Sequence, residues 1–384
     1  MKIVHICLAC FYVEGMGYQE NILPQYHAMM GHVVSVLTSD YAFNSKYEAT
    51  KKNTKEYVNE HNIHVRVLEA AKGKIGSRLR KYIGLYAELD AIKPDVIFVH
   101  GGQFVSLKDV VLYCKRHSSV RLYIDQHGDY YNTPVDTPKR KFIQTVVFGF
   151  WMRKAAKNTQ KFWGVTPWRC EYLRDVYKLP KDKIDLLVMG GDDRYIHFDQ
   201  MPKLRSDIRN RLNIEEDDFV LITGGKIDKP KNIHLLMQAV DELHEPKIKL
   251  IVFGQPNNEM ESIIASYAEK DCIQNLGWID SKCVYDYFLA SDLAVFPGTH
   301  SVLWEQSCAC GLPGLFKDWK GMHHVEVNGS AEFLYDDSVE EMKRKILELY
   351  QNKEKYNMMK NAAQLYGVKA FSYADIARRA IGLE

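Results

Sequence analysis

Short apolar runs alternate with helical stretches along most of this chain, and this alternation limits the possible folds more than any other feature of the sequence. The clearest runs are Lys2–Leu8, Val33–Thr38, Asp95–Val99, Phe219–Thr223 and Leu293–Phe296. Polar or glycine-rich residues follow each run, which is typical of strands buried on both faces of a parallel sheet. Strands separated by helices predict an α/β fold with doubly wound parallel sheets.

The alternation occurs twice, with a polar segment between the two series. A chain of 384 residues, 46% of them hydrophobic, is long enough to bury two cores. We interpret the polar and charged segment Arg194–Asp218 as a linker, because a new series of strands begins at Phe219. The sequence therefore predicts an N-terminal domain over residues 1–198 and a C-terminal domain over residues 199–365.

The composition argues against several classes of protein. A formal net charge of +2 does not favour a nucleic-acid partner. Eight cysteines without framework spacing are typical of reduced thiols. No cleavage signal follows the apolar run at the N-terminus, and the longest apolar run, Val146–Met152, is too short to span a bilayer. We therefore expect a cytoplasmic protein.

The stretch Ala290–Pro313 combines a buried strand, a glycine-containing loop and a helix start. The helix is predicted to begin near Ser301, and unpaired N–H groups around Val302 and Leu303 suit an anion such as phosphate. Glu305 lies about one turn inside this helix, where a carboxylate can reach a sugar hydroxyl beside that phosphate. In the alternative interpretation, Glu305 only completes the first helical turn electrostatically.

Two lysines bracket another loop at the end of a predicted strand. Lys226 directly follows Gly225, and Lys231 lies at the other end of the same loop. Two ammonium groups in one cleft repel each other unless an anion lies between them, and a diphosphate fits that arrangement. The alternative is a pair of solvated loop lysines.

Glycine and histidine follow two predicted strands of the N-terminal half. Gly15 and Gly17 lie in the loop after the first strand, where glycines let a ligand approach backbone N–H groups. They do not form a dinucleotide fingerprint, because Glu20 occupies the third glycine position. His127 follows the strand Arg121–Asp125 and is placed to contact a substrate hydroxyl or to move a proton. The alternative is a hydrogen-bonded packing histidine.

Two segments, Lys72–Tyr82 and Lys139–Lys157, are basic and aromatic and contain no acidic residue. Such segments suit attraction to anionic lipid or to a pyrophosphate, with partial insertion of the rings. The residues expected on this acceptor or membrane side are Arg78, Arg80, Lys81, Lys139, Arg140 and Lys141. The alternative is a solvated basic face beside a core helix.

Several motifs, taken in chain order, resemble one family of enzymes. The retaining glycosyltransferases of family 4 have segments similar to GHVVSVLTSD, PDVIFVH, LLVMGGDD, GGKIDKPKNIHLLMQAV, NLGWID and LWEQSCACGLP. The resemblance covers nearly the whole chain. It implies the GT-B fold, in which two Rossmann-like domains face each other across a deep cleft. It also implies that the segment from about residue 366 to residue 384 returns to the N-terminal domain.

The resemblance further implies which residues bind a nucleotide sugar. The two loop lysines would hold the diphosphate, and Glu305 would hold the ribose. The family usually has another glutamate eight residues earlier; this chain lacks it, and His300 or Ser301 falls in its place. The expected donor-binding residues are Gly15, Gly17, Gly225, Trp278, Ile279, His300, Ser301, Val302, Leu303 and Glu305, and the expected catalytic residues are Lys226, Lys231 and His127.

The resemblance and the lack of an Asp-x-Asp motif together predict sugar transfer without a metal or cofactor. The diphosphate would depart toward cations and N–H groups already in place, and the acceptor would attack the same face of the sugar. The expected partners are a UDP-linked sugar and a glycan or lipid-linked acceptor of a bacterial surface polysaccharide, at the inner face of the cell membrane. Two alternatives stay open: a nucleotide-sugar epimerase or hydrolase with the same fold, and a catalytically idle nucleotide-sugar-binding subunit.

Overall fold

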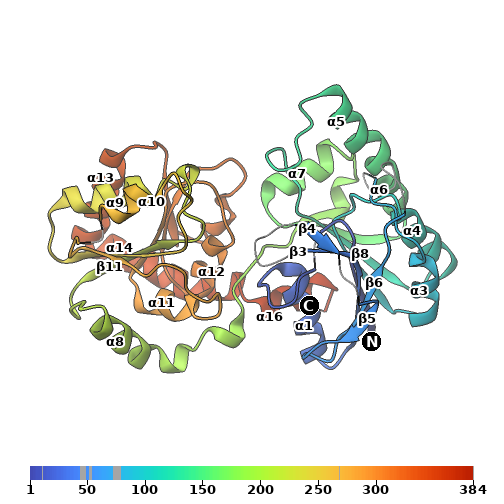
Figure 1. Ribbon diagram of the computed structural model, residues 1–384, viewed down its shortest axis with the longest axis horizontal. Helices are drawn as coiled ribbons and strands as arrows, with labels where there is room; N and C mark the ends of the chain where they lie inside the picture. The colour runs from blue at the N-terminus through green and yellow to red at the C-terminus, as the bar shows by residue number, and fades with distance from the viewer. Residues whose placement is uncertain (11, 44–48, 52–53, 72–78, 268, 384) are drawn as a thin grey trace. The chain divides into compact units, whose positions relative to one another are not determined.

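A computed structural model describes the chain in two compact units (Figure 1). The described residues are 1–10, 12–43, 49–51, 54–71, 79–267 and 269–383. The N-terminal unit comprises Met1–Val188 and Ile376–Glu384, and the C-terminal unit comprises Met189–Asp375.

The boundaries between the units lie about ten residues away from the predicted positions. The C-terminal unit begins at Met189 and not at residue 199, and the chain returns at Ile376 and not near residue 366. The polar cluster after Val188 belongs to the C-terminal unit because its groups bond there: the backbone N–H of Asp192 donates to the hydroxyl of Tyr285 at 3.0 Å.

An eight-stranded sheet forms the N-terminal unit, with strand order β10-β9-β8-β7-β1-β2-β6-β5. All neighbours are parallel except β5 and β6. The strands are β1 (Lys2–Cys7), β2 (Val33–Ser39), β5 (Glu56–Val58), β6 (His64–Leu68), β7 (Val96–His100), β8 (Arg121–Gln126), β9 (Thr159–Gly164) and β10 (Ile184–Leu186), with a separate antiparallel pair β3 (Tyr41–Phe43) and β4 (Ala49–Lys51). Because β1, β7 and β8 are neighbours, their carboxyl ends meet at one edge.

Helices pack on this sheet and bury its aliphatic core. They are α1 (Gln19–Met29), α3 (Leu85–Ile92), α4 (Leu107–Arg116), α5 (Pro138–Phe142), α6 (Gly149–Ala155) and α7 (Pro167–Asp175), and a π-helical stretch, Ile143–Phe148, joins α5 to α6. Strand residues such as Ile97 and Val99 are fully buried, as is Met152 of α6. The apolar centre of the basic segment 139–157 is therefore partly core, as its alternative interpretation states.

The C-terminal unit is built on a six-stranded parallel sheet with strand order β13-β12-β11-β14-β15-β16. Its strands are β11 (Phe219–Gly224), β12 (Ile248–Phe253), β13 (Ile273–Asn275), β14 (Leu293–Phe296), β15 (Gly314–Lys317) and β16 (Ala331–Leu334). The predicted α/β class with two parallel sheets is confirmed. The prediction missed β15, which begins directly after Leu312 and Pro313.

The helices of this unit include one that was predicted as linker. They are α8 (Met201–Arg211), α9 (Ile233–Leu243), α10 (Glu261–Ala265), α11 (Val284–Ala290), α12 (Leu303–Ala309), α13 (Val339–Gln351), α14 (Lys353–Ala362) and α15 (Val368–Ala370). Helix α16 (Tyr373–Ala380) begins in this unit and ends in the N-terminal unit. The linker interpretation of Arg194–Asp218 is wrong, because α8 packs into the unit. Arg209 is 1% exposed and donates to the Asp292 carboxylate at 2.7 Å.

The last residues of the chain bond to the N-terminal unit. The indole N–H of Trp163 donates to the carbonyl of Ala380 at 3.1 Å, and His27 Nε2 bonds to the carbonyl of Ala377 at 2.8 Å. These contacts attach the end of α16 to β9 and α1.

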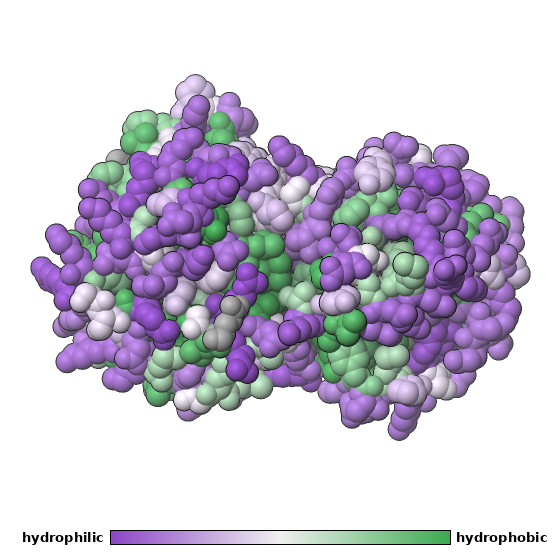
Figure 2. All heavy atoms as spheres, turned by 180° about the vertical axis from the view of Figure 1, so that it is seen from behind, coloured by the Kyte–Doolittle hydropathy of each residue, from purple (hydrophilic) through white to green (hydrophobic). Residues whose placement is uncertain are grey.

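Hydrophilic residues cover most of the face seen in Figure 2. Among the residues that the structure describes, no helix is both long enough and apolar enough to cross a membrane. The helical segment 138–155 nevertheless exposes three apolar side chains at four-residue spacing, Phe142, Val146 and Phe150. Residues four apart lie on one face of a helix, so these side chains form a common exposed stripe.

Candidate functional site

Three loops pack against one another at the carboxyl edge of the C-terminal sheet. They follow β11, β12 and β14 and meet at glycines. A side chain at Gly254 would overlap the carbonyl of Gly225, and one at Gly298 would overlap the carbonyl of Pro230. The N–H of Thr299 donates to the same Pro230 carbonyl at 3.0 Å. Glycine is therefore required where the backbones approach most closely.

Lys231 is tied into these loops, whereas Lys226 is not. The Lys231 ammonium donates to the carbonyls of Thr299 at 2.6 Å and His300 at 3.0 Å. Burial and, to a smaller extent, the nearby Lys226 lower the pKa of Lys231 to about 8, although Asp228 opposes this shift. Lys226 is mostly exposed and pairs with Asp228 at 3.2 Å. The two lysines thus lie near each other, one as a loop tether and one open to solvent.

Glu305 is enclosed by two histidines. Its Oε1 accepts from Nε2 of His300 and from Nε2 of His324, both at 2.8 Å, and the residue is 0% exposed. Burial would raise the pKa of Glu305, but the two histidines outweigh it and hold the pKa well below its usual range. Its Oε2 is buried without a hydrogen-bond partner among the described residues. A direct ribose contact would require Glu305 to leave this enclosure.

His324 was not predicted as a site residue. It lies in a short 3-10 turn, His323–Val325, far along the chain from Glu305. The sequence carries no local signal for this contact, because the turn follows β15, a strand that the prediction missed. His300 keeps 9% of its side chain exposed and is the more accessible of the two histidines that bond Glu305.

The other predicted donor residues are scattered around these loops. Trp278 is 69% exposed, so its ring is available to a ligand. A side chain at Gly225 would contact Leu303, which places the start of α12 against the β11 loop. Among the residues that the structure describes, no side-chain hydrogen bond or ion pair joins Ser301, Val302 or Ile279 to the lysines. Gly15 and Gly17, in the N-terminal unit, have open space around them.

His127 lies at the carboxyl edge of the N-terminal sheet beside a buried carboxylate. Its Nε2 lies 3.0 Å from Oδ2 of Asp125, and His100 Nδ1 lies 2.9 Å from the same oxygen. Burial lowers the pKa of His127, but Asp125 outweighs it and raises the pKa above the usual value. The other oxygen of Asp125 accepts from the N–H of Gly101 at 2.9 Å. The ring of His127 is therefore oriented, with 29% of its side chain exposed.

The predicted basic residues differ in their surroundings. Arg78 lies outside the described residues. Arg80 donates to the carbonyl of Ala9 and so is partly a structural residue. Arg140 of α5 pairs at 3.0 Å with Asp136, which lies just before this helix. Lys81, Lys139 and Lys141 are exposed.

Within the described part of the chain, two groups bring enough nitrogen and oxygen atoms together to suit a metal ion. One contains His100, Asp125 and His127, and the other is the enclosure of Glu305. In both groups the histidine nitrogens lie 2.8–3.0 Å from one carboxylate oxygen, the separation of an N–H···O hydrogen bond. Hydrogen bonding accounts for both arrangements, and the prediction of a metal-free site stays a prediction.

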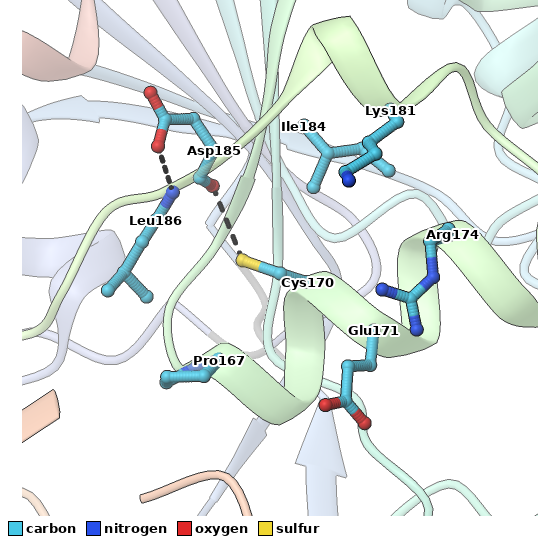
Figure 3. A pocket seen from close by; sticks show the side chains of 8 residues that line it. All are labelled: Pro167, Cys170, Glu171, Arg174, Lys181, Ile184, Asp185 and Leu186. Atoms are coloured by element: carbon cyan, nitrogen blue, oxygen red, sulfur yellow. Dashed lines mark hydrogen bonds between the residues drawn. The ribbon is translucent and has the colours of Figure 1, made fainter. Parts of the chain in front are cut away.

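A cavity of about 340 Å³ lies elsewhere, between α7 and β10 (Figure 3). Its lining residues are Pro167, Cys170, Glu171, Arg174, Lys181, Ile184, Asp185 and Leu186. Cys170 donates to the carbonyl of Asp185, and burial raises the pKa of this thiol to about 11. A thiol with a raised pKa is a poor nucleophile, so this cavity shows no sign of covalent chemistry.

Similar solved structures define the class of fold. A glycosyltransferase from Rickettsia africae ESF-5 is similar with a TM-score of 0.74 at 13% identity, over 100% of this chain and 97% of that one. Anabaena HepE in complex with UDP is similar with a TM-score of 0.69 at 15% identity, over 99% and 98%. This likeness shows the GT-B fold, with two Rossmann-like units.

Family models place the chain more narrowly. The Glycosyltransferase Family 4 model matches residues 22–193, and the Glycosyl transferases group 1 model matches residues 205–366. The chain belongs to these group 1 and family 4 glycosyltransferases, which confirms the resemblance seen in the sequence.

A curated relative adds a more specific comparison. The lipopolysaccharide 1,2-N-acetylglucosaminetransferase of Salmonella typhimurium is 26% identical over 197 residues, which are 46% of this chain and 50% of the relative. The chain spans about half the length of the curated relatives it matches.

Proposed function

We propose that this protein is a retaining glycosyltransferase that moves a sugar from a nucleoside diphosphate, with UDP as the first candidate, to a glycan or lipid-linked acceptor of a surface polysaccharide. The observation that carries the proposal is the lysine pair in the region matched by the group 1 model: Lys226 is exposed at the end of β11, and Lys231 lies beside it. A structural neighbour in complex with UDP supports the choice of nucleotide.

Lys226 and Lys231 suit different parts of diphosphate departure. Lys226 is mostly exposed and can exchange its partner Asp228 for a phosphate oxygen. Lys231 holds the loop after β14 and adds a positive charge that is poorly solvated. A charged hydrogen bond contributes about 1.5–3 kcal/mol, and cations already in place need no reorganisation when charge develops on the leaving oxygen. No metal or cofactor is part of this proposal.

His300 is the proposed donor contact at the position of the missing glutamate. Glu305 orients it through the 2.8 Å bond to Nε2, so the carboxylate acts on the donor through this ring. A neutral His300 that donates from Nε2 has Nδ1 left as an acceptor for a sugar hydroxyl. Trp278, which is mostly exposed, is the proposed surface for the base.

His127 is the proposed contact from the N-terminal unit. Its Nε2 is directed at Asp125, and Nδ1 has no hydrogen bond among the described residues. The raised pKa favours the charged ring, which can donate from Nδ1 to a hydroxyl of the substrate. In this role His127 stabilises developing negative charge or transfers a proton.

The exposed stripe Phe142, Val146 and Phe150 is the proposed acceptor-side membrane contact. Lys139 and Lys141 at the start of the same helical segment are exposed and would attract anionic lipid. The double substitution Phe142→Ser and Phe150→Ser should reduce co-sedimentation of the protein with phosphatidylglycerol vesicles. Leu112→Ser, which alters an exposed residue of α4, is the matched control; equal sedimentation of both variants would remove this contact.

Calorimetric titration with UDP tests the donor site. Lys226→Ala should weaken binding by about 10- to 100-fold, the equivalent of one charge-assisted contact. Lys229→Ala is the control, because Lys229 is exposed in the same loop. Unchanged affinity in Lys226→Ala would contradict the proposed site.

Product analysis separates this function from its alternatives. Transfer to an added acceptor with retained configuration supports the proposal. Release of free sugar without an acceptor would indicate a hydrolase, and binding without turnover would indicate an idle subunit.

A further inference from the structure

A line of hydrogen-bonded side chains crosses the N-terminal unit, from the carboxyl edge of its sheet to the returning end of the chain. Each link is short enough to be a direct hydrogen bond. The links are His127 Nε2 to Asp125 Oδ2 at 3.0 Å, Asp125 Oδ2 to His100 Nδ1 at 2.9 Å, His100 Nε2 to His5 Nδ1 at 3.0 Å, His5 Nε2 to His27 Nδ1 at 2.9 Å, and His27 Nε2 to the Ala377 carbonyl at 2.8 Å.

The three histidines in the middle, His5, His27 and His100, are called here the histidine chain. All three are 0% exposed, as is Asp125. They meet because β1, β7 and β8 are neighbours: His100 is directly paired with Asp125, and His5 is paired with Phe98, two residues before His100. Helix α1 supplies His27. Water therefore cannot substitute for any partner in this line without a rearrangement.

The directions of the bonds determine how many protons the histidine chain holds. The Ala377 carbonyl can only accept, so His27 donates from Nε2 and its Nδ1 accepts from His5. His5 Nδ1 accepts in turn from His100. His100 must also donate from Nδ1, because the carboxylate of Asp125 only accepts. Four bonds need four protons, whereas three neutral rings carry three. One excess proton is therefore required.

The bond directions place this proton on His100, because His100 must donate from both ring nitrogens. Burial and the charges of its two histidine neighbours hold the pKa of His5 well below the usual value, and burial lowers the pKa of His27 to about 4. Burial would raise the pKa of Asp125, but His127 and His100 outweigh it and hold the pKa below its usual range. His100 and Asp125 then form a fully buried ion pair.

We propose that the docked C-terminal segment, through the Ala377 carbonyl, forces one excess proton into the histidine chain and thereby sets the charge that His127 meets at Asp125. Without that carbonyl, three neutral rings could satisfy every other bond by reversing their tautomers, leaving His27 Nε2 free. With the carbonyl in place, the charge on His100 partly neutralises Asp125. The histidine chain thus positions and tunes His127. Its role in catalysis rests on the proposed function.

Other titratable groups face this line without changing the count. Glu20 of α1 raises the pKa of His127, and Arg169 of α7 lowers it. The thiol of Cys10 faces Asp125, and His32 faces His27. Every ring nitrogen of the histidine chain already has a partner, so these groups alter the affinity for the excess proton but not the number of bonds that need one.

Ring ¹⁵N NMR of the full chain, at pH 8 and without substrate, tests the proton count. An ordinary histidine, with a pKa of about 6.5, is neutral at this pH. We expect one doubly protonated ring, His100, and two neutral rings protonated at Nε2, His5 and His27. Three neutral rings in the wild type would overturn the proposal, as would the shifts of metal-bound nitrogens at His100 and His127 in the protein as purified.

Two substitutions at one position test the role of the carbonyl. In His27→Gln the amide can still donate to Ala377 and accept from His5, so the doubly protonated His100 should persist. In His27→Phe the constraint is lost, so His100 and His5 should both become neutral and protonated at Nδ1. Identical ring spectra for the two variants would overturn the link to Ala377. The wild-type spectrum decides the proton count even if His27→Phe folds poorly.

The pH profile of sugar transfer tests the consequence for His127. Without the charge on His100, the negative charge of Asp125 acts on His127 alone and raises its pKa. The part of the pH–rate profile that reports the titration of His127 should therefore move up by about one pH unit in His27→Phe. It should not move in His27→Gln. His64→Phe, at an exposed position on β6, is the control. An unmoved limb in His27→Phe overturns the positioning role. Absence of any sugar transfer, with the expected ring spectra, overturns the proposed function alone.

Discussion

The two units each bury one carboxylate between two histidines, yet the two clusters are built differently. In the N-terminal unit, Oδ2 of Asp125 bonds to two histidines and Oδ1 accepts from the N–H of Gly101. In the C-terminal unit, Oε1 of Glu305 bonds to two histidines, but Oε2 has no partner among the described residues. The first carboxylate is fully satisfied, and the second is not.

This difference separates a rigid support from a site that can still gain a partner. A buried polar group without a hydrogen bond costs about 1–3 kcal/mol, and a ligand that supplies the bond recovers that energy. The Glu305 cluster lies beside the lysine-containing loops, where a donor is proposed to bind. Both oxygens of Asp125 already accept hydrogen bonds, so this carboxylate acts on His127 by orientation and charge.

Removing the satisfied carboxylate should produce the largest effect on stability. Asp125→Ala removes the buried acceptor that bonds His100, His127 and the N–H of Gly101, so the free energy of unfolding should fall by about 3–5 kcal/mol. Urea denaturation followed by circular dichroism measures this. His64→Ala, on an exposed part of the same sheet, should change the free energy by less than about 0.5 kcal/mol. A fall no larger than that control would show that the bonds to Asp125 do not stabilise the unit.

Releasing the loop beside the unsatisfied cluster should affect activity most. Lys231→Ala removes the tether to the carbonyls of Thr299 and His300 together with the positive charge, so kcat/KM should fall by roughly 10- to 1000-fold. Lys229→Ala should retain nearly wild-type rates. A normal rate in Lys231→Ala would exclude both the tether and the charge as contributions to catalysis.

The two clusters should lose stability in different pH ranges. The pKa of His27 falls from 6.5 to about 4 on folding, so the unfolded chain binds more protons between these values. This contribution of about 3 kcal/mol is complete above pH 6.5 and is lost as the pH falls toward 4. The depressed pKa of Glu305 gives stability that is complete above about pH 4.5 and is lost below it. The free energy of unfolding, measured from pH 7 to pH 3, should show both losses of stability. The loss between pH 6.5 and pH 4 should be absent in His27→Gln.

Glu305→Gln should have the smallest effect of the four. The amide keeps one acceptor for His300 or His324 but weakens two charged bonds, so we expect a loss of about 1–3 kcal/mol in the free energy of unfolding. If Glu305 were instead exposed to solvent and only contacted the ribose, the substitution would hardly change the free energy of unfolding. Calorimetry with UDP on the same variant distinguishes the two roles: unchanged stability with weaker binding would favour a direct ribose contact over the enclosure seen here.

Much of the fold and part of the site could be predicted from the sequence. Apolar runs such as Phe219–Thr223 and Leu293–Phe296 indicate their strands locally, because burial on both faces of a parallel sheet demands continuous apolar residues. Polar residues that directly follow such runs, including His127 and Lys226, are placed at the carboxyl edge by the same reasoning. The Arg194–Asp218 segment was misjudged, because Arg209 is polar in sequence yet buried by its pairing with Asp292.

The sequence by itself therefore determined the α/β class, the two sheets and the family, since these depend on local periodicity and motif order. The tertiary structure alone decided which histidines meet which carboxylates. His5, His27 and His100 belong to separate elements, and only the sheet order β8-β7-β1, with α1 packed beside it, brings them into one line that ends at Ala377. Neighbouring strands in a parallel sheet need not be consecutive in the chain, so such contacts have no local signature.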